Sequence, residues 1–401
     1  MELRTKKNAR LVEANLAIAT VALALPVYYA KRYHPHSRFE KPALNLPIHH
    51  RFQKSLKLMQ TLLRNFLVAI SLVVGTAVFA GDVEDGNAVS ARKDYATALR
   101  KYKSAAAKGD AYAQFSLGIM YSNGRGVLQD YAEAVRWYKL AAVQGLASSQ
   151  LNLGLMYYNG HGVVQDYAEA VNWWKLSAAQ GNAPAQLNLG NMYDAGQGVV
   201  QDYAESVRWY KLAAAQGEKL AQFNIGLMYS NGQGVVQDYA ETVRWWKLSA
   251  AQGQRAAQYN LGVMYDNGQG VLQDDTEAVR LYKFAAAQGH ASAQYNLGLM
   301  YHNGRGVVQD YAEAVRLYKL AAAQGISLAQ SNLGFMYENG HGVVQDYVRA
   351  HMWMNLAAVS GDATKAVKNR DIVAAKMSTQ QIAEAQKLAR ECQARNFKSC
   401  D

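Results

Sequence analysis

The sequence predicts an all-α fold, a solenoid of stacked antiparallel helix pairs, and three observations lead to this class. Most of the 401-residue chain repeats every 36 residues without insertion or deletion, so that segments 152–181 and 296–325 are nearly identical. Each repeat carries two apolar patterns of helical spacing. Glycines follow both patterns, and an aspartate precedes the second. Because so short a helix pair cannot bury its apolar faces alone, it must stack on its neighbours.

Two unvarying columns define the repeat region, which spans residues 94–361. The glycine column consists of Gly118, Gly154, Gly190, Gly226, Gly262, Gly298 and Gly334. The aspartate column consists of Asp130, Asp166, Asp202, Asp238, Asp274, Asp310 and Asp346. Together they mark seven full units, and the segment 94–109 is similar to the second half of one more. The solenoid is therefore expected to begin with a half unit.

The first helix of a unit is illustrated by the second unit, where it is expected over 149–158. A small residue, Ser149 here and alanine in the other six units, suits close helix packing. Gly154 lies beside the same face and allows a neighbouring helix to approach closely. Gly160 or Gly162 can adopt the left-handed conformation that ends the helix.

The second helix of the same unit is expected to begin at Asp166, which serves as its N-cap. Glu169 follows three residues later, which is the sequence pattern of a capping box. Apolar residues continue at helical spacing until Gly181 closes the helix. The aromatic pair Trp173 and Trp174 has counterparts in most units, and we interpret these near-constant rings as packing residues.

The charge distribution argues against nucleic-acid binding. The formal net charge is +11, but residues 1–80 hold 12 Lys and Arg against 3 Asp and Glu. Residues 81–401 hold 30 against 28, so the repeats are nearly neutral. A phosphate-binding surface needs clustered Lys and Arg on the folded part of a chain. We therefore expect no nucleic-acid partner.

The N-terminal segment is interpreted as an export signal. The stretch 65–81 carries no charge and contains Ala80 near its end, which is typical of a signal peptide cleaved after that residue. We expect residues 59–80 to be the signal peptide, 1–58 to be a basic extension from a mis-assigned start, and 81–93 to be a linker. The expected location is periplasmic or secreted. The alternative is an uncleaved leader that anchors the same protein in a membrane.

The C-terminal segment 362–401 is expected to cap the solenoid with helices. The sequence 378–393 begins with Ser378 as a helix cap and has only a thin apolar stripe, as suits a terminal element. The chain has two cysteines, Cys392 and Cys400. Because an exported protein meets an oxidising compartment, we expect them to form a disulfide.

The repeat resembles the Sel-one-like repeat (SLR) family, a relative of the tetratricopeptide repeats. In the second unit the resemblance rests on Ala147, Gln150, Leu153, Gly154, Met156, Tyr157, Gly160, Gly162, Val163, Asp166, Ala170, Trp173 and residues 178–181. It implies a right-handed superhelix that binds proteins and assembles complexes. Units five and six depart from the pattern with Leu281 and Leu317 in place of Trp, which does not threaten the fold.

The varying positions of the first helices predict a binding groove for a protein or peptide, on the concave face if first helices line the inner curve. An apolar floor is expected from Phe223, Leu227, Tyr259, Tyr295 and Leu299. A ladder of amides runs beside it, formed by Asn152, Asn188, Asn224, Asn260 and Asn296. Asparagine side chains can hydrogen-bond the backbone of an extended peptide. The alternative is that the aromatic column packs against the next unit and that the amides tie adjacent helices.

The motifs predict no enzyme. Repeated Asp and Glu are explained as helix caps, and the "GHGV" and "GRGV" loops lack the lysine and spacing of phosphate-binding motifs. We expect no cofactor and no metal site, since no His and Cys cluster has ligand spacing. We expect a non-catalytic interaction scaffold of the cell envelope. The alternative is a hydrolase acting on cell-wall or β-lactam substrates, as implied by exported SLR relatives that have a cysteine pair in each repeat, which this chain lacks.

Overall fold

A computed structural model describes residues 86–401, apart from 92, 361–362, 398–399 and 401. Every regular element within these limits is a helix. The labelled helices are α3 (Tyr95–Ala107), α4 (Ala111–Asn123), α5 (Tyr131–Val143), α6 (Ala147–Asn159), α7 (Tyr167–Ala179), α8 (Ala183–Ala195), α9 (Tyr203–Ala215), α10 (Lys219–Asn231), α11 (Tyr239–Ala251), α12 (Arg255–Asn267), α13 (Asp275–Ala287), α14 (Ala291–Asn303), α15 (Tyr311–Ala322), α16 (Ser327–Asn339), α17 (Tyr347–Ser360), α18 (Ala363–Ala374) and α19 (Thr379–Ala394).

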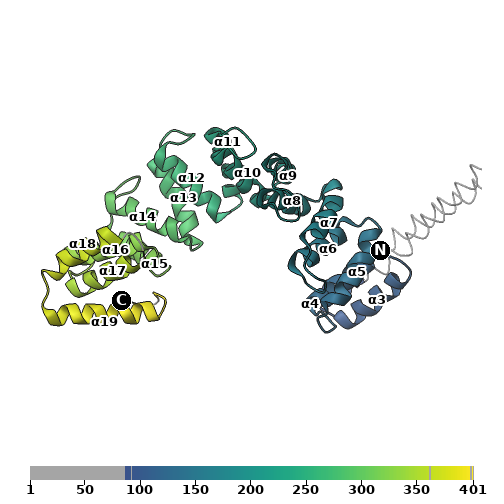
Figure 1. The fold of residues 1–401 in the computed structure, drawn as a ribbon, viewed down its shortest axis with the longest axis horizontal. Helices are drawn as coiled ribbons and strands as arrows, with labels where there is room; N and C mark the ends of the chain where they lie inside the picture. The colour runs from purple at the N-terminus through teal and green to yellow at the C-terminus, as the bar shows by residue number, and fades with distance from the viewer. Residues whose placement is uncertain (1–85, 92, 361–362, 398–399, 401) are drawn as a thin grey trace, which may run out of the picture. The chain divides into compact units, whose positions relative to one another are not determined.

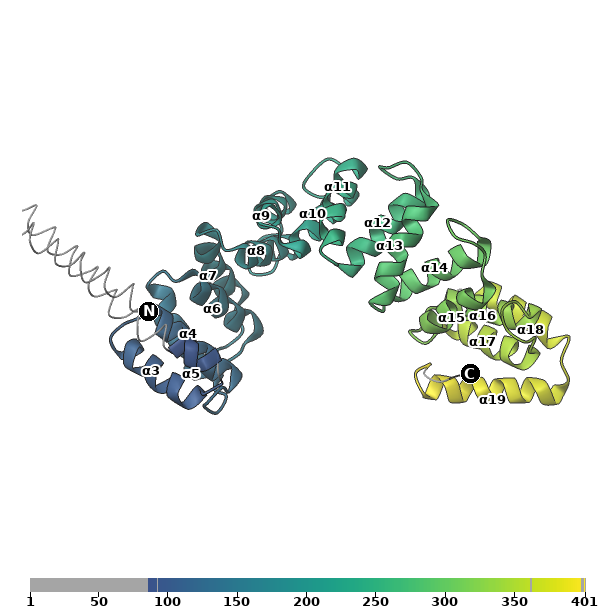
Figure 2. The same cartoon turned by 180° about the vertical axis from the view of Figure 1, so that it is seen from behind.

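The helices pack as consecutive pairs, which confirms the predicted solenoid class. Each even-numbered helix from α4 to α16 packs against the helix that follows it, and each pair contacts the next through its second helix. Figures 1 and 2 show these pairs following one another in chain order. Among the described residues, none of the helices combines the length and apolarity needed to cross a bilayer. The predicted extension 1–58, the signal peptide 59–80 and the first part of the linker 81–93 lie outside the described residues.

The predicted glycine stops occur, and the two glycines of each loop have different tasks. Gly160 has a φ of 69° and donates its N–H to the Met156 carbonyl, so it caps α6. Gly162 is also left-handed, with a φ of 72°. A β-carbon at Gly162 would collide with the backbone of Tyr131 in the preceding unit. The second glycine therefore allows the loop of one unit to pack against the unit before it.

The predicted N-cap is confirmed, but the predicted capping box of α7 is wrong in its second half. The Asp166 carboxylate accepts the Glu169 N–H at 2.9 Å, as expected. The Asp166 N–H, however, donates to the Tyr157 carbonyl at 3.0 Å and is not available to the Glu169 side chain. The Glu169 carboxylate instead accepts a hydrogen bond from Asn172. A true capping box occurs at the start of α19, between Ser378 and Gln381.

Small residues allow the two helices of each unit to pack closely. Ser149 and the alanines at the equivalent positions are fully buried. A β-carbon at Gly154 would collide with the indole of Trp174 on α7. From Gly118 to Gly298, the glycine column thus leaves room for the large ring of the second helix, and Gly334 leaves room for Met354, as the sequence predicted for close approach.

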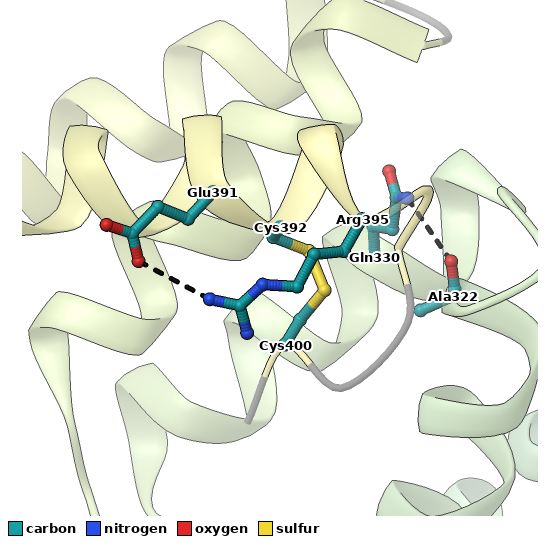
Figure 3. Close-up of a disulfide and its surroundings, with 6 residues drawn as sticks. All are labelled: Ala322, Gln330, Glu391, Cys392, Arg395 and Cys400. Atoms are coloured by element: carbon teal, nitrogen blue, oxygen red, sulfur yellow. Dashed lines mark hydrogen bonds and ion pairs between the residues drawn. A yellow bond between two sulfur atoms is a disulfide. The ribbon is translucent and has the colours of Figure 1, made fainter.

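A buried glutamine column joins each pair of helices to the next. Gln150 donates from Nε2 to the Ala142 carbonyl at 3.1 Å, and its Oε1 accepts from Gln180 at 2.8 Å. One side chain thereby connects α5, α6 and α7. Equivalent glutamines repeat this arrangement from Gln114 to Gln294. Gln330 keeps only the first of the two bonds, and Figure 3 shows its amide donating to the Ala322 carbonyl. The side-chain amides of these glutamines therefore join adjacent helices through hydrogen bonds.

The C-terminal helix α19 packs on α17 through small side chains. Its buried residues are Ala385, Ala389 and Cys392, whereas the apolar residues of the predicted stripe, such as Leu388, are only half-buried. Cys392 and Cys400 are joined by a disulfide that links α19 to the residues after it (Figure 3).

Candidate functional site

The exposed side of α4, α6, α8, α10, α12, α14 and α16 is called the first-helix face, and it contains the predicted groove residues. The aromatic members of the predicted floor are half-buried. Phe223 stacks on Trp246 with ring centroids 6.1 Å apart, and Tyr259 lies 6.0 Å from Tyr282. Tyr295 makes the same contact with the ring of its own second helix. Each ring therefore packs against the core on one side and remains accessible to solvent on the other. Both expected roles, packing and surface exposure, apply to this column.

The aliphatic floor residues are placed in the same way. Leu227 packs at the edge of the core around Trp246, and Leu299 packs at the edge of the core around Tyr318. Both are half-buried rather than enclosed. The first-helix face therefore presents apolar side chains that are anchored at their base.

The asparagine ladder is half-buried throughout, and its amides have two kinds of environment. Where the preceding second helix has a tyrosine, the amide meets its hydroxyl. Asn296 donates to the Tyr282 hydroxyl at 3.2 Å, and Asn152 interacts with the Tyr138 hydroxyl. Where that helix has a tryptophan, as at Trp246, the indole N–H donates to a backbone carbonyl instead. Consequently, some ladder amides serve the fold and others do not.

The ladder members that follow a tryptophan are Asn188 and Asn260. The indole of Trp174 donates to the Leu151 carbonyl and that of Trp246 to the Phe223 carbonyl, both at 3.1 Å. Neither asparagine side chain has a hydrogen-bond partner among the described residues. These two amides are therefore available to a bound chain.

A hollow of about 360 Å³ opens on the first-helix face between α8, α9 and α10. Two predicted residues, Asn224 and Leu227, line it together with Asn191, Asp194 and Tyr210. Asn191 and Asp194 stand at varying positions of the first helix, but they were predicted neither as floor residues nor as members of the amide ladder. The signal was present, because Asn191 is the one polar residue in a column that otherwise reads Ile119, Leu155, Leu227, Val263, Leu299 and Phe335.

The hollow is lined by both polar side chains and apolar ones such as Leu227 and Met228. The Tyr210 hydroxyl donates to Asn191 Oδ1 at 2.8 Å, and the Asn224 amide donates to the same oxygen at 3.1 Å. Burial raises the pKa of the Asp194 carboxyl. Burial also raises the pKa of Tyr210, and the nearby Asp194 charge adds to this effect. The site thus combines a partly desolvated carboxylate with fixed amides and a neutral phenol.

A second hollow, of about 740 Å³, lies between α11, α12 and α13 and is lined mainly by residues of the second helices α11 and α13. Its lining includes Phe284, Lys247 and Tyr265, and the Lys247 ammonium lies 5.5 Å from the Tyr265 ring centroid. The sequence analysis did not predict it. The only signal is that Phe284 replaces a leucine found in the other units.

The described residues give no indication of a metal centre. No three His, Cys, Asp or Glu side chains gather within this part of the chain to form a ligand set. His161 and His341 stack on Tyr131 and Tyr311 of the preceding units, with ring centroids 4.7 Å apart in both cases. These imidazoles pack one unit onto the next.

The model of the Sel1 repeat family matches seven consecutive segments: 111–146, 147–182, 183–218, 219–254, 255–290, 291–326 and 327–362. They cover more than half of the chain, and each begins where a first helix begins. The chain belongs to the Sel1 repeat family. Sel1 repeat proteins are generally non-catalytic scaffolds that mediate protein–protein interactions. No curated protein matches this Sel1 chain.

Two solved Sel1-type structures are similar to this one. A Sel1 repeat protein from Oxalobacter formigenes is 31% identical over 60% of this chain and 96% of its own, with a TM-score of 0.54. A protective antigen of uropathogenic Escherichia coli with an SLR fold is 30% identical over 81% of this chain and 86% of its own, with a TM-score of 0.42. The Oxalobacter structure supports the Sel1 helical-repeat fold.

Proposed function

We propose that this Sel1 repeat protein is a non-catalytic scaffold of the cell envelope that binds a peptide or protein segment on its first-helix face. The observation that carries the proposal is the 360 Å³ hollow on that face, which brings Asn224 and Leu227 together. Elsewhere on the face, Asn188 and Asn260 offer amides without a partner among the described residues. A bound segment would satisfy these groups.

The chemistry of the face suits an extended chain. An asparagine amide supplies two donors and one acceptor oxygen, which match the N–H and C=O groups of a peptide backbone. Half-buried apolar side chains beside the amides, such as Leu227 and Leu299, provide contact for alternate side chains of the same peptide. The positions that vary between units then determine which segment is bound.

The proposal is tested by replacing apolar residues with glutamate on one face at a time. Leu227→Glu and Leu299→Glu place a charge on the first-helix face. Leu248→Glu and Leu320→Glu place the same charge on second helices, where the leucines are already 45% and 42% exposed. Affinity-captured envelope proteins are quantified for each variant and for the unaltered chain. We expect at least tenfold less of a specific partner with the first pair only.

Equal losses with both pairs, or no loss with either, would refute the first-helix face as the binding surface. Folding is monitored by circular dichroism, because Leu227 and Leu299 are half-buried and a charge there can destabilise the fold, whereas charges at exposed positions usually change the free energy of unfolding by less than about 0.5 kcal/mol. If a glutamate variant unfolds, the serine variant at the same position is measured instead.

We further propose that the protein is exported, with its mature chain beginning at Gly81. The support is the uncharged stretch 65–81, which ends in small residues. The mass of the mature N-terminal peptide, measured on protein from the native cell, tests this. A mature chain that retains residues before Gly81 would favour the membrane-anchored alternative or a different address.

A further inference from the structure

The next-to-last residue of each first helix varies between units. These residues are called the helix-end column, and they are Ser122, Tyr158, Asp194, Ser230, Asp266, His302 and Glu338. Three of them are carboxylates, and all three are half-buried. A partly desolvated carboxylate is stabilised by a cation close to it.

The chain itself supplies that cation for two of the three. Arg305, from the loop of the next unit, places Nη2 at 2.6 Å from Asp266 and at 2.7 Å from Asp275. Lys376 places its ammonium 2.8 Å from the Glu338 carboxylate. The protein therefore contains two internal examples of a cation bound at this column.

Asp194 is the exception. The position equivalent to Arg305 is occupied by Gln233, and Asp194 and Gln233 line the same 360 Å³ hollow. The Asp194 carboxylate has no ion pair or hydrogen bond with any described residue. A hollow of this volume lies in the range of ligand pockets.

The neighbouring residues keep this carboxylate free. In the Asp266 unit, the Tyr282 hydroxyl donates to the carboxylate at 3.2 Å. In the Asp194 unit, the equivalent Tyr210 hydroxyl donates to Asn191 at 2.8 Å instead. Asn191 thus takes the donor that Asp194 would otherwise receive.

We propose that the Asp194 hollow receives the cationic side chain, arginine or lysine, of the bound partner segment. The inference rests on the proposed function of the first-helix face and identifies one residue type that its partner must carry. The cation takes the place that Arg305 occupies beside Asp266. The aromatic ring of Tyr158, which also lines the hollow, offers a surface on which a guanidinium can stack. Partial burial of Asp194 strengthens the attraction, because solvent screens the pair less.

Synthetic peptides test the inference with the full repeat region. The probes are capped Gly-Ser-Arg-Ser-Gly and two counterparts in which lysine or uncharged citrulline replaces arginine, titrated to 10 mM by NMR. We expect the arginine or lysine peptide to bind at least tenfold more tightly than the citrulline peptide. Asp194→Asn removes the charge with little change in shape, and we expect it to abolish this preference. The absence of binding by either cationic peptide, or an unchanged preference in Asp194→Asn, would overturn the inference.

A second variant fills the hollow from within. Gln233→Arg reproduces the residue found at Arg305, and we expect its guanidinium to occupy the Asp194 site and exclude the cationic peptides. Glu205→Gln is the charge-matched control, because Glu205 lies on a second helix and pairs with Arg208 at 2.9 Å. Glu205→Gln should leave peptide binding unchanged. Cationic peptides that bind Gln233→Arg as well as the unaltered chain contradict the assignment.

The capture experiment separates this inference from the proposed function. If both hold, Leu227→Glu and Asp194→Asn each reduce partner capture. If only the proposed function holds, Leu227→Glu reduces capture and Asp194→Asn does not. If the proposed function is wrong, neither change affects capture, whatever the peptides do.

Discussion

Single side chains decide how the amides of the first-helix face are used. A tyrosine at one position of the second helix, such as Tyr282, extends its hydroxyl to the next asparagine of the ladder. A tryptophan at the same position, such as Trp246, directs its N–H to a backbone carbonyl and leaves the asparagine alone. The choice of Tyr or Trp at this position from Tyr138 to Tyr282 therefore divides the ladder into structural amides and available ones.

This division predicts different stabilities for two identical substitutions. Asn296→Ala should lower the free energy of unfolding by about 1 kcal/mol, because it removes a hydrogen bond to a buried hydroxyl. Asn260→Ala should change it by less than about 0.5 kcal/mol. Urea denaturation of both variants, together with Tyr282→Phe and the Asn296→Ala/Tyr282→Phe double variant, measures the coupling. Equal effects at positions 260 and 296 would show that the ladder is used uniformly.

His351 predicts a pH dependence. It is 3% exposed on α17, and the equivalent residue in the six other full units is a buried valine. Burial lowers the pKa of His351, Arg370 lowers it further, and Asp371 opposes them. Because the folded-state pKa lies below the unfolded value of about 6.5, the unfolded chain binds the proton more readily. Stability is therefore retained above pH 6.5 and lost as the pH falls below it.

The valine of the other units is the matched replacement. His351→Val should weaken the loss of stability between pH 7 and pH 5 and should raise stability at neutral pH by about 1 kcal/mol, since Nδ1 has no hydrogen-bond partner among the described residues. Thermal unfolding at several pH values provides the measurement. A pH profile identical to that of the unaltered chain would assign the dependence to other groups, such as His290 and His302, whose pKa values burial also lowers.

At the scale of the element, helices are held together more by buried amides than by surface ion pairs. Gln258, which is 6% exposed, donates to the Ala250 carbonyl at 3.2 Å and accepts from Gln288 at 2.8 Å. The Glu and Arg pairs on the second helices, such as Glu277 and Arg280, lie at the surface, where such pairs contribute little. Each glutamine thus connects three successive helices.

Gln258→Leu should therefore lower the free energy of unfolding by about 1–2 kcal/mol, through two hydrogen bonds lost in a buried place. Gln237→Leu is the control. Gln237 also makes two hydrogen bonds, to the Ser230 carbonyl at 2.8 Å and the Tyr239 hydroxyl at 3.1 Å, but it is exposed. Its replacement should cost less than about 0.5 kcal/mol. If urea denaturation shows that Gln237→Leu lowers the free energy of unfolding more than Gln258→Leu does, the loop hydrogen bonds contribute more to stability than the buried glutamine column.

For the whole molecule, the sequence predicts the fold far better than the site. Because the same pattern occurs in seven units, the ends and packing faces of the helices can be predicted from it. The close contact at Gly154 and the helix cap at Asp166 follow in this way. The free carboxylate of Asp194 depends on Asn191, which departs from its apolar column, and on Gln233, which stands where the Asp266 site has Arg305; both matter only once their neighbours are known. The predicted capping box of α7 is wrong for a similar reason, because the Asp166 N–H donates to the carbonyl of Tyr157, which lies outside the motif.

The 360 Å³ hollow opens on the first-helix face, whereas the 740 Å³ hollow is lined mainly by residues of second helices, so one measurement tests the central claim. A photo-crosslinking amino acid at position 227 reports on the first-helix face, and the same group at position 284 reports on the 740 Å³ hollow. After irradiation in the native cell envelope, crosslinked peptides are identified by mass spectrometry. We predict a specific partner crosslinked at 227, through a segment containing arginine or lysine, and none at 284. A partner crosslinked at 284 alone would contradict the account.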